Sequence, residues 1–156
     1  MKRAAAVLST AAVVLWTAGV FAQAKPDFSG TWTVDAEKTT AAGGRAGRGG
    51  GGGGMTLKQD ATSLTFTSGR EGATPIVYKL DGSAVEVPMG GRGGGGTAQA
   101  KAVWEGNTIV ITTTLPNGER KAVYAMEGEW LTIATTSPGR EGGAATTNKV
   151  YYKKGM

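Results

Sequence analysis

The sequence predicts an all-β protein: an antiparallel up-and-down meander barrel of about 8–10 strands, with no helical domain. Apolar and polar residues alternate with a period of two throughout the region after residue 25, and no helical period is present. Short segments rich in Thr, Val, Ile and aromatic residues are separated by Gly, Asn, Asp and Pro. Long and short connections between these segments alternate along the chain, as a regular meander requires.

The N-terminus has the three regions of a Sec-type signal peptide. Residues 1–3 are a short basic start, residues 4–21 are almost wholly apolar or small, and Ala22-Gln23-Ala24 is a small-x-small site. We expect cleavage after Ala24, the alternative being an uncleaved N-terminal anchor. No cysteine is available for lipid attachment at that site. The expected location is therefore periplasmic or secreted.

Composition narrows the function of residues 25–156, which we expect to form a single domain. The sequence contains no cysteine, so no disulfide stabilises it, and no histidine, so a Ser-His-Asp site is impossible. No cluster of metal-ligating residues is evident, and we expect neither a cofactor nor enzymatic activity. The net charge of +5 includes Lys2 and Arg3 of the leader. The remaining mild basicity does not predict nucleic-acid binding, and no later apolar run is long enough to span a membrane.

Ten strands are expected in residues 25–156. Their ranges are 30–35, 55–60, 63–68, 75–80, 84–88, 97–104, 108–114, 120–127, 130–136 and 146–153. Tight turns are expected at 60–62, 81–83, 105–107 and 127–129, where Gly or Asp supplies the required backbone conformation or side-chain hydrogen bond. The other connections, 36–54, 69–74, 89–96, 115–119 and 137–145, are expected to be long loops. In a meander all the tight turns lie at one end and all the long loops at the other.

Alternation also predicts which side chains face the barrel interior. The inward candidates are Leu57, Leu64, Phe66, Ile76, Tyr78, Leu80, Val85, Val87, Ile109, Ile111, Leu131, Ile133, Val150 and Tyr152. In 97–104 the inward residues would be Ala98, Ala100, Ala102 and Trp104, and three small side chains in a row leave space. That space is either a ligand cavity or is filled from across the barrel by tyrosines. The candidate interior ligand contacts are Tyr78, Ala100, Tyr124 and Tyr152.

Two Gly/Arg-rich loops, at 41–54 and 89–96, admit two interpretations. They are either flexible low-complexity insertions or part of an anion-binding surface. All arginines after the leader lie in or beside a long loop, and they are Arg45, Arg48, Arg70, Arg92, Arg120 and Arg140. Guanidinium groups suit the capture of carboxylate, sulfate or phosphate. We therefore treat these six as candidate rim residues that would meet an anionic ligand or an anionic envelope surface.

The opening Phe28-Ser29-Gly30-Thr31-Trp32 resembles the Gly-x-Trp start of lipocalins and fatty-acid-binding proteins. The chain is also similar to small exported bacterial lipocalin-like, calycin-type domains, through Asp35-Ala36-Glu37-Lys38-Thr39, the Trp-Glu-Gly-Asn turn at 104–107 and the closing Val150-Tyr151. The resemblance implies a structural role for Gly30 and Trp32 in closing the tight-turn end of the barrel. It also implies a basic side chain laid over Trp32, for which Lys149 or Lys153 is the expected residue.

These features lead to two hypotheses. The first is an extracytoplasmic, lipocalin-like barrel that binds a small hydrophobic or amphiphilic anionic ligand, such as a lipid, through its Arg-rich loop end. The alternative is a non-enzymatic structural or interaction module of the cell envelope, with a filled barrel and flexible Gly-rich loops. An enclosed cavity of roughly 300 Å³ or more would favour the first.

Overall fold

The computed structural model describes residues 24–45, 54–89, 95–139 and 143–155. The expected signal peptide and Arg48, Arg92 and Arg140 lie outside the described residues. In the described part, ten strands form one antiparallel sheet. They are β1 (Gly30–Val34), β2 (Met55–Gln59), β3 (Ser63–Ser68), β4 (Ile76–Lys79), β5 (Val85–Met89), β6 (Gly96–Glu105), β7 (Thr108–Leu115), β8 (Gly118–Glu127), β9 (Trp130–Ser137) and β10 (Thr146–Lys154). Every predicted strand is present, and the predicted all-β meander barrel is confirmed.

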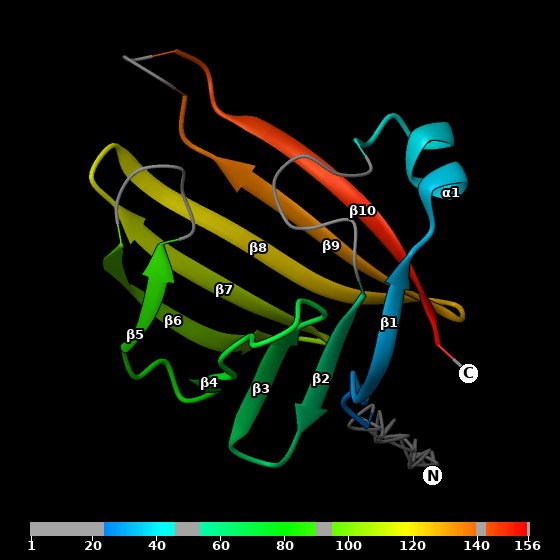
Figure 1. The fold of residues 1–156 in the computed structure, drawn as a ribbon, viewed down its shortest axis with the longest axis horizontal. Helices are drawn as coiled ribbons and strands as arrows, with labels where there is room; N and C mark the ends of the chain where they lie inside the picture. Colours follow the sequence, from blue (N-terminus) through cyan, green and yellow to red (C-terminus); the bar gives the residue numbers. More distant parts are fainter. Residues whose placement is uncertain (1–23, 46–53, 90–94, 140–142, 156) are drawn as a thin grey trace, which may run out of the picture.

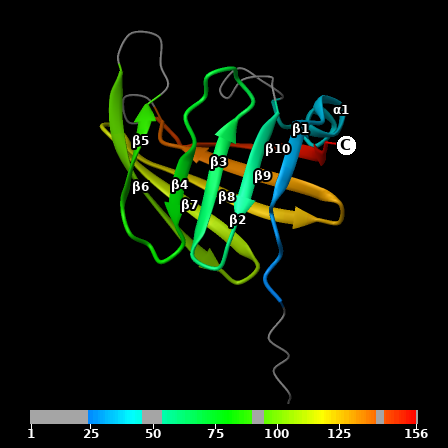
Figure 2. The same ribbon diagram turned by 60° about the horizontal axis from the view of Figure 1, so that its bottom comes forward.

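The sheet curls until two groups of strands face each other. Its order is β4-β3-β2-β1-β10-β9-β8-β7-β6-β5, so the first and last strands of the chain pair with each other. In Figure 2, β1–β4 cross in front of the long strands β6–β9, and the core lies between these two layers. In Figure 1 the same curved wall is seen, with the C-terminal end of β10 beside the start of β1.

The hydrogen-bonded wall has one opening, between β4 and β5. The expected hairpin at 81–83 does not pair these two strands, which are the two edges of the sheet. Instead the connection crosses to β6, where Asp81 forms an isolated bridge with Val103 and the Gly82 amide donates to the Ala102 carbonyl at 3.0 Å. The prediction that all consecutive strands are paired neighbours is therefore wrong at this one step.

The tight turns follow from local chemistry. Gly82, Gly106 and Gly128 have φ values of +84°, +60° and +64°, which favour glycine. The Asp60 carboxylate accepts from the backbone amides of Thr62 and Ser63, both at 2.7 Å. These side-chain bonds replace ladder bonds that the reversing chain cannot make.

Two connections differ from the sequence prediction. Residues 115–119 are not a long loop, because β7 and β8 extend until only Pro116 and Asn117 lie between them. The expected loop 36–54 begins instead with a short helix, α1 (Ala36–Ala41), capped by the Asp35 carboxylate, which accepts from the Lys38 amide at 2.7 Å. A helix of this length shows no periodicity in a sequence scan, and its capping residue was the signal that could have revealed it.

Helix α1 lies outside the barrel, beside β10 (Figure 1). It covers the edge of β10 where β1 has ended. The Asp35 amide donates to the Tyr151 carbonyl at 2.8 Å, and the Thr39 hydroxyl accepts from the Tyr151 amide at 3.0 Å. Further along, the Arg45 amide donates to the Asn148 side chain at 2.7 Å. Side-chain and loop groups thus continue the ladder and protect an otherwise open strand edge.

Candidate functional site

The barrel interior differs between its two ends. At the tight-turn end the space is filled by large side chains that are at most 1% exposed, namely Phe28, Trp32, Leu57, Leu64, Ile109 and Leu131. The ring of Phe28 also stacks on Trp104, with 5.8 Å between ring centroids. This end is a packed apolar plug, so it offers a ligand no route to the interior.

The loop-end half of the interior holds a pocket of about 270 Å³. Its lining comes from eight of the ten strands and comprises Gly54, Met55, Phe66, Ser68, Ile76, Tyr78, Val87, Pro88, Ile111, Thr113, Arg120, Ala122, Tyr124, Ile133, Thr135 and Tyr152. The volume is slightly below the range of roughly 300–1,000 Å³ typical of drug-sized sites. The interior is therefore neither fully filled nor large.

The wall is mixed: apolar side chains alternate with polar ones, and each of the polar side chains carries a hydrogen-bond donor. Arg120, Ala122 and Tyr124 alternate along β8, so all three face the interior. Tyr78 comes from β4 and Tyr152 from β10. Residues far apart in the sequence thus share the pocket because the curled sheet brings their strands around one space.

Among the described residues, Arg120 carries the only formal charge in the lining, and no Asp, Glu or Lys lines the pocket. Within the same residues no carboxylate pairs with Arg120. Its side chain is half buried. A half-buried guanidinium that lines a pocket without a paired carboxylate favours an anion as its partner.

Burial keeps the hydroxyls of the three tyrosines protonated to a higher pH than a free phenol. Burial raises the pKa of the Tyr78 hydroxyl, and the positive charge of Arg120 opposes that rise. Burial also raises the pKa of Tyr152 and, far more strongly, that of Tyr124, where the nearby Tyr78 and Tyr152 add to the effect. Arg120 and the three phenols are therefore close enough to influence one another electrostatically, with Tyr78 linking Arg120 to Tyr124.

The structure brings together four of the candidate site residues: Arg120, Tyr78, Tyr124 and Tyr152 all line the pocket. Ala100 is fully buried but does not line it. The strand that carries it, β6, contacts β4 across the opening in the wall. Arg45 and Arg70 are exposed at the loop end.

Thr113 and Thr135 also line the pocket, and continuing the inward alternation of Ile111 and Ile133 by one step would have predicted both.

The cation over Trp32 is neither Lys149 nor Lys153. The Lys154 ammonium lies 5.8 Å from the Trp32 ring centroid, because β10 pairs residue 154 with Trp32 and both face inward. Lys153 has the opposite parity and faces outward. Gly30 permits this arrangement, since a Cβ there would lie 2.8 Å from the Lys154 Cε atom.

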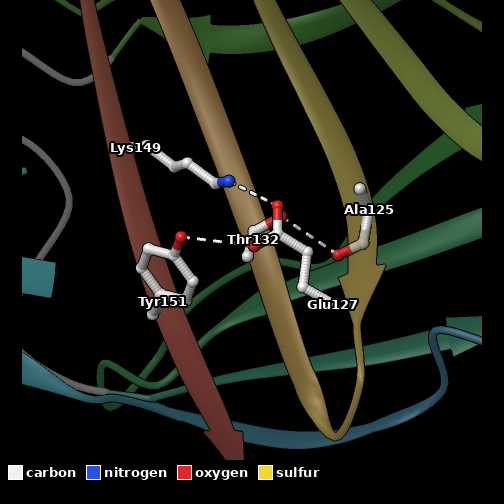
Figure 3. Close-up of polar contacts among 5 residues, drawn as sticks. All are labelled: Ala125, Glu127, Thr132, Lys149 and Tyr151. Atoms are coloured by element: carbon white, nitrogen blue, oxygen red, sulfur yellow. Dashed lines mark hydrogen bonds and ion pairs between the residues drawn. The ribbon is translucent and has the colours of Figure 1, made fainter. Parts of the chain in front are cut away.

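Lys149 belongs to a second polar cluster, on the outer surface (Figure 3). Its ammonium bonds the Glu127 carboxylate, which also accepts from the Tyr151 hydroxyl at 3.2 Å. The bond from Lys149 lowers the pKa of Glu127, and the same bond raises the pKa of Lys149. Because these side chains are exposed, the pair is stabilising by only about 0–1 kcal/mol. The cluster does not reach the pocket.

Among the described residues there is no group of three or more acidic side chains that could hold a metal ion. No helix in the described ranges is both long and apolar enough to cross a membrane.

Known structures share this architecture. A mutant of the fluorescent protein UnaG has a TM-score of 0.56 at 16% identity, covering 83% of this chain and 96% of that one. Zebrafish ileal bile acid-binding protein, in complex with cholic acid, has a TM-score of 0.55 at 17% identity, covering 81% and 98%. The fold is a calycin-type barrel. The fatty-acid-binding protein of Manduca sexta gives 0.49 at 20% identity, covering 64% and 71%. No protein-family model and no curated protein sequence matches the chain.

Proposed function

We propose that this protein is a non-enzymatic binding barrel that takes a small amphiphilic anion into its loop-end pocket, with Arg120 as the charged contact. The observation that carries the proposal is the guanidinium of Arg120, which lines a partly apolar pocket and pairs with no carboxylate among the described residues. A carboxylate or sulfate would neutralise Arg120, and an apolar body would cover Met55, Phe66 and Ile133. The binding of cholic acid by a structural neighbour is consistent with this chemistry.

The pocket sets a limit on ligand size. A cavity of about 150 Å³ holds one benzene ring, or about 25 Å³ for each non-hydrogen atom. At that packing the pocket of about 270 Å³ encloses about eleven such atoms. The enclosed part of the ligand is therefore much smaller than a long-chain fatty acid.

Calorimetric titration with decanoate and with 1-decanol tests the proposal, because the two probes differ in charge and hardly in size. We expect the Arg120→Met variant to bind decanoate about 10- to 100-fold more weakly, the range expected for a hydrogen bond to a charged group. Binding of 1-decanol should be unaffected. Arg70→Met is the matched control, since Arg70 is exposed and does not line the pocket. Failure of every small carboxylate to bind would leave the envelope-module alternative.

We also propose that the protein acts outside the cytoplasm after removal of residues 1–24. The basic, apolar and small-x-small regions of the leader support this. The mass of the protein recovered from an extracytoplasmic fraction should correspond to an N-terminus at Lys25. A chain that begins at Met1 and stays in the cytoplasmic fraction would contradict export. Replacing Ala22 and Ala24 with leucine should block processing and accumulate the precursor.

A further inference from the structure

The inner part of the pocket contains a buried phenol that has no protein partner. Tyr124 is only 7% exposed and lines the pocket, yet no hydrogen bond joins its hydroxyl to another described residue. Within the described residues, no buried side-chain oxygen is sealed away without a partner, so this hydroxyl reaches the open space of the pocket. Buried tyrosine hydroxyls normally find a hydrogen-bond partner. The missing partner of Tyr124 must therefore come from the pocket contents.

Tyr124 lies deeper in the pocket than Arg120. The two residues are four positions apart on the same face of β8, which places their Cα atoms about 13 Å apart along the strand. Arg120 is near the loop end of β8, whereas Tyr124 pairs with Ile109, which belongs to the apolar plug. Tyr78 interacts electrostatically with both Arg120 and Tyr124. Polar groups thus follow one another from the outer part of the pocket to its floor.

An unsubstituted hydrocarbon tail does not fit this floor well. A tail that entered ahead of its carboxylate would cover the Tyr124 hydroxyl and provide no hydrogen-bonding group, which is unfavourable for a buried donor. A hydroxyl or carbonyl at the far end of the ligand would avoid that cost. Because all three phenols are held neutral, each can both donate and accept a hydrogen bond.

We propose that the natural ligand is a compact hydroxylated or oxo acid, with its carboxylate on Arg120 and its second polar group on Tyr124. This inference rests on the proposed function and specifies its ligand class. Small hydroxy-aromatic acids meet both requirements. 4-Hydroxycinnamate, for example, has about the number of non-hydrogen atoms that the pocket encloses. Its flat ring would lie between the apolar walls.

The test compares 4-hydroxycinnamate with cinnamate, which lacks only the hydroxyl, by calorimetric titration. We expect the wild-type protein to bind the hydroxylated acid at least tenfold more tightly. In the Tyr124→Phe variant this advantage should fall below about twofold, because the deep partner is gone. Tyr151→Phe is the matched control, since that phenol lies on the outer face and bonds Glu127. It should keep the full advantage.

The outcomes separate the two proposals. If both acids bind with equal affinity in the wild-type protein, a water molecule rather than ligand satisfies Tyr124, and the hydroxy-acid inference is wrong while anion binding stands. If the advantage persists in Tyr124→Phe, the second polar contact lies elsewhere and the assignment to Tyr124 is overturned. If neither acid nor decanoate binds, the proposed function itself fails. Should Tyr124→Phe unfold, the wild-type comparison of the two acids still decides whether the ligand carries a second polar group.

Discussion

The hydroxyl of Thr39, in α1, accepts a hydrogen bond from the backbone amide of Tyr151, in β10, at 3.0 Å. The two residues are 112 positions apart, and Thr39 is fully buried. The Thr39 side chain thus takes the place of a neighbouring strand where β10 continues beyond the end of β1. The helix therefore protects the edge of β10 from outside the barrel.

Replacing Thr39 with valine should destabilise the fold by about 1–3 kcal/mol, because the Tyr151 amide loses its partner while the shape of the side chain is kept. Thr40→Val is a close control, since Thr40 lies next to it in the same helix and is exposed. Denaturant unfolding of both variants measures the difference. Equal stability of the two variants would show that the ladder does not need this hydroxyl.

Trp32→Phe should cost about 2–4 kcal/mol of stability. The indole Nε1 atom donates to the Phe28 carbonyl at 2.9 Å in a fully buried position. Phenylalanine would remove that bond and leave a small cavity in the plug. Trp130→Phe, at a half-buried outer position, should cost less than 1 kcal/mol. The ligand affinity of folded Trp32→Phe should be unchanged, because Trp32 does not line the pocket.

Ala100→Leu should destabilise the barrel by about 1–3 kcal/mol through overpacking. Ala100 is fully buried in the core, between the buried Ala98 and Ala102 on the same face of β6. The neighbouring Gln99 is exposed, and Gln99→Leu should leave stability nearly unchanged. Thermal unfolding of the pair provides the measurement. A stable Ala100→Leu protein would mean that open space remains beside this row.

Acid should weaken the turn at Asp60. Hydrogen bonds from Ser63 and Thr62 lower the pKa of Asp60 to about 2, whereas the unfolded chain titrates near the ordinary value of 3.8. The stabilisation is thus fully present above pH 4 and is lost as the pH falls towards 2. The stability difference between wild type and Asp60→Asn should therefore shrink over this window. A difference that is constant from pH 7 to 2 in urea unfolding would contradict the assignment.

Much of the fold was predictable because the sequence signals of a strand are local. Alternation, turn glycines and the Asp60 turn are properties of a few adjacent residues, and all ten strands were located from them. The prediction of a long loop at 115–119 was wrong. Pro and Gly in a sequence usually mark the end of a strand, but β7 and β8 continue to pair up to Leu115 and Gly118.

The candidate site was less accessible to sequence analysis. Alternation placed Tyr78 and Tyr152 on the inner face, and Tyr124 was named with them as a tyrosine that could occupy the interior, but Arg120 was grouped with the loop arginines because of its position in the chain. Alternation along 120–127 would have put Arg120 on the same face as Tyr124, and the closed barrel shows that both line one pocket. Likewise, the pairing of residue 154 with Trp32 depends on how β10 closes against β1.

The sequence alone determined where the strands and most of the tight turns lie, because these depend on local patterning. It also excluded disulfides and histidine-dependent catalytic sites, because the residue types that they need are absent. The tertiary structure decided that the turn end is plugged, that a pocket of about 270 Å³ remains at the loop end, and that one arginine and three phenols share it. The physical reason is that the sheet closes into a barrel. The side chains that meet inside a barrel come from strands far apart in sequence, and their distances are set only when the sheet curls and its first and last strands pair.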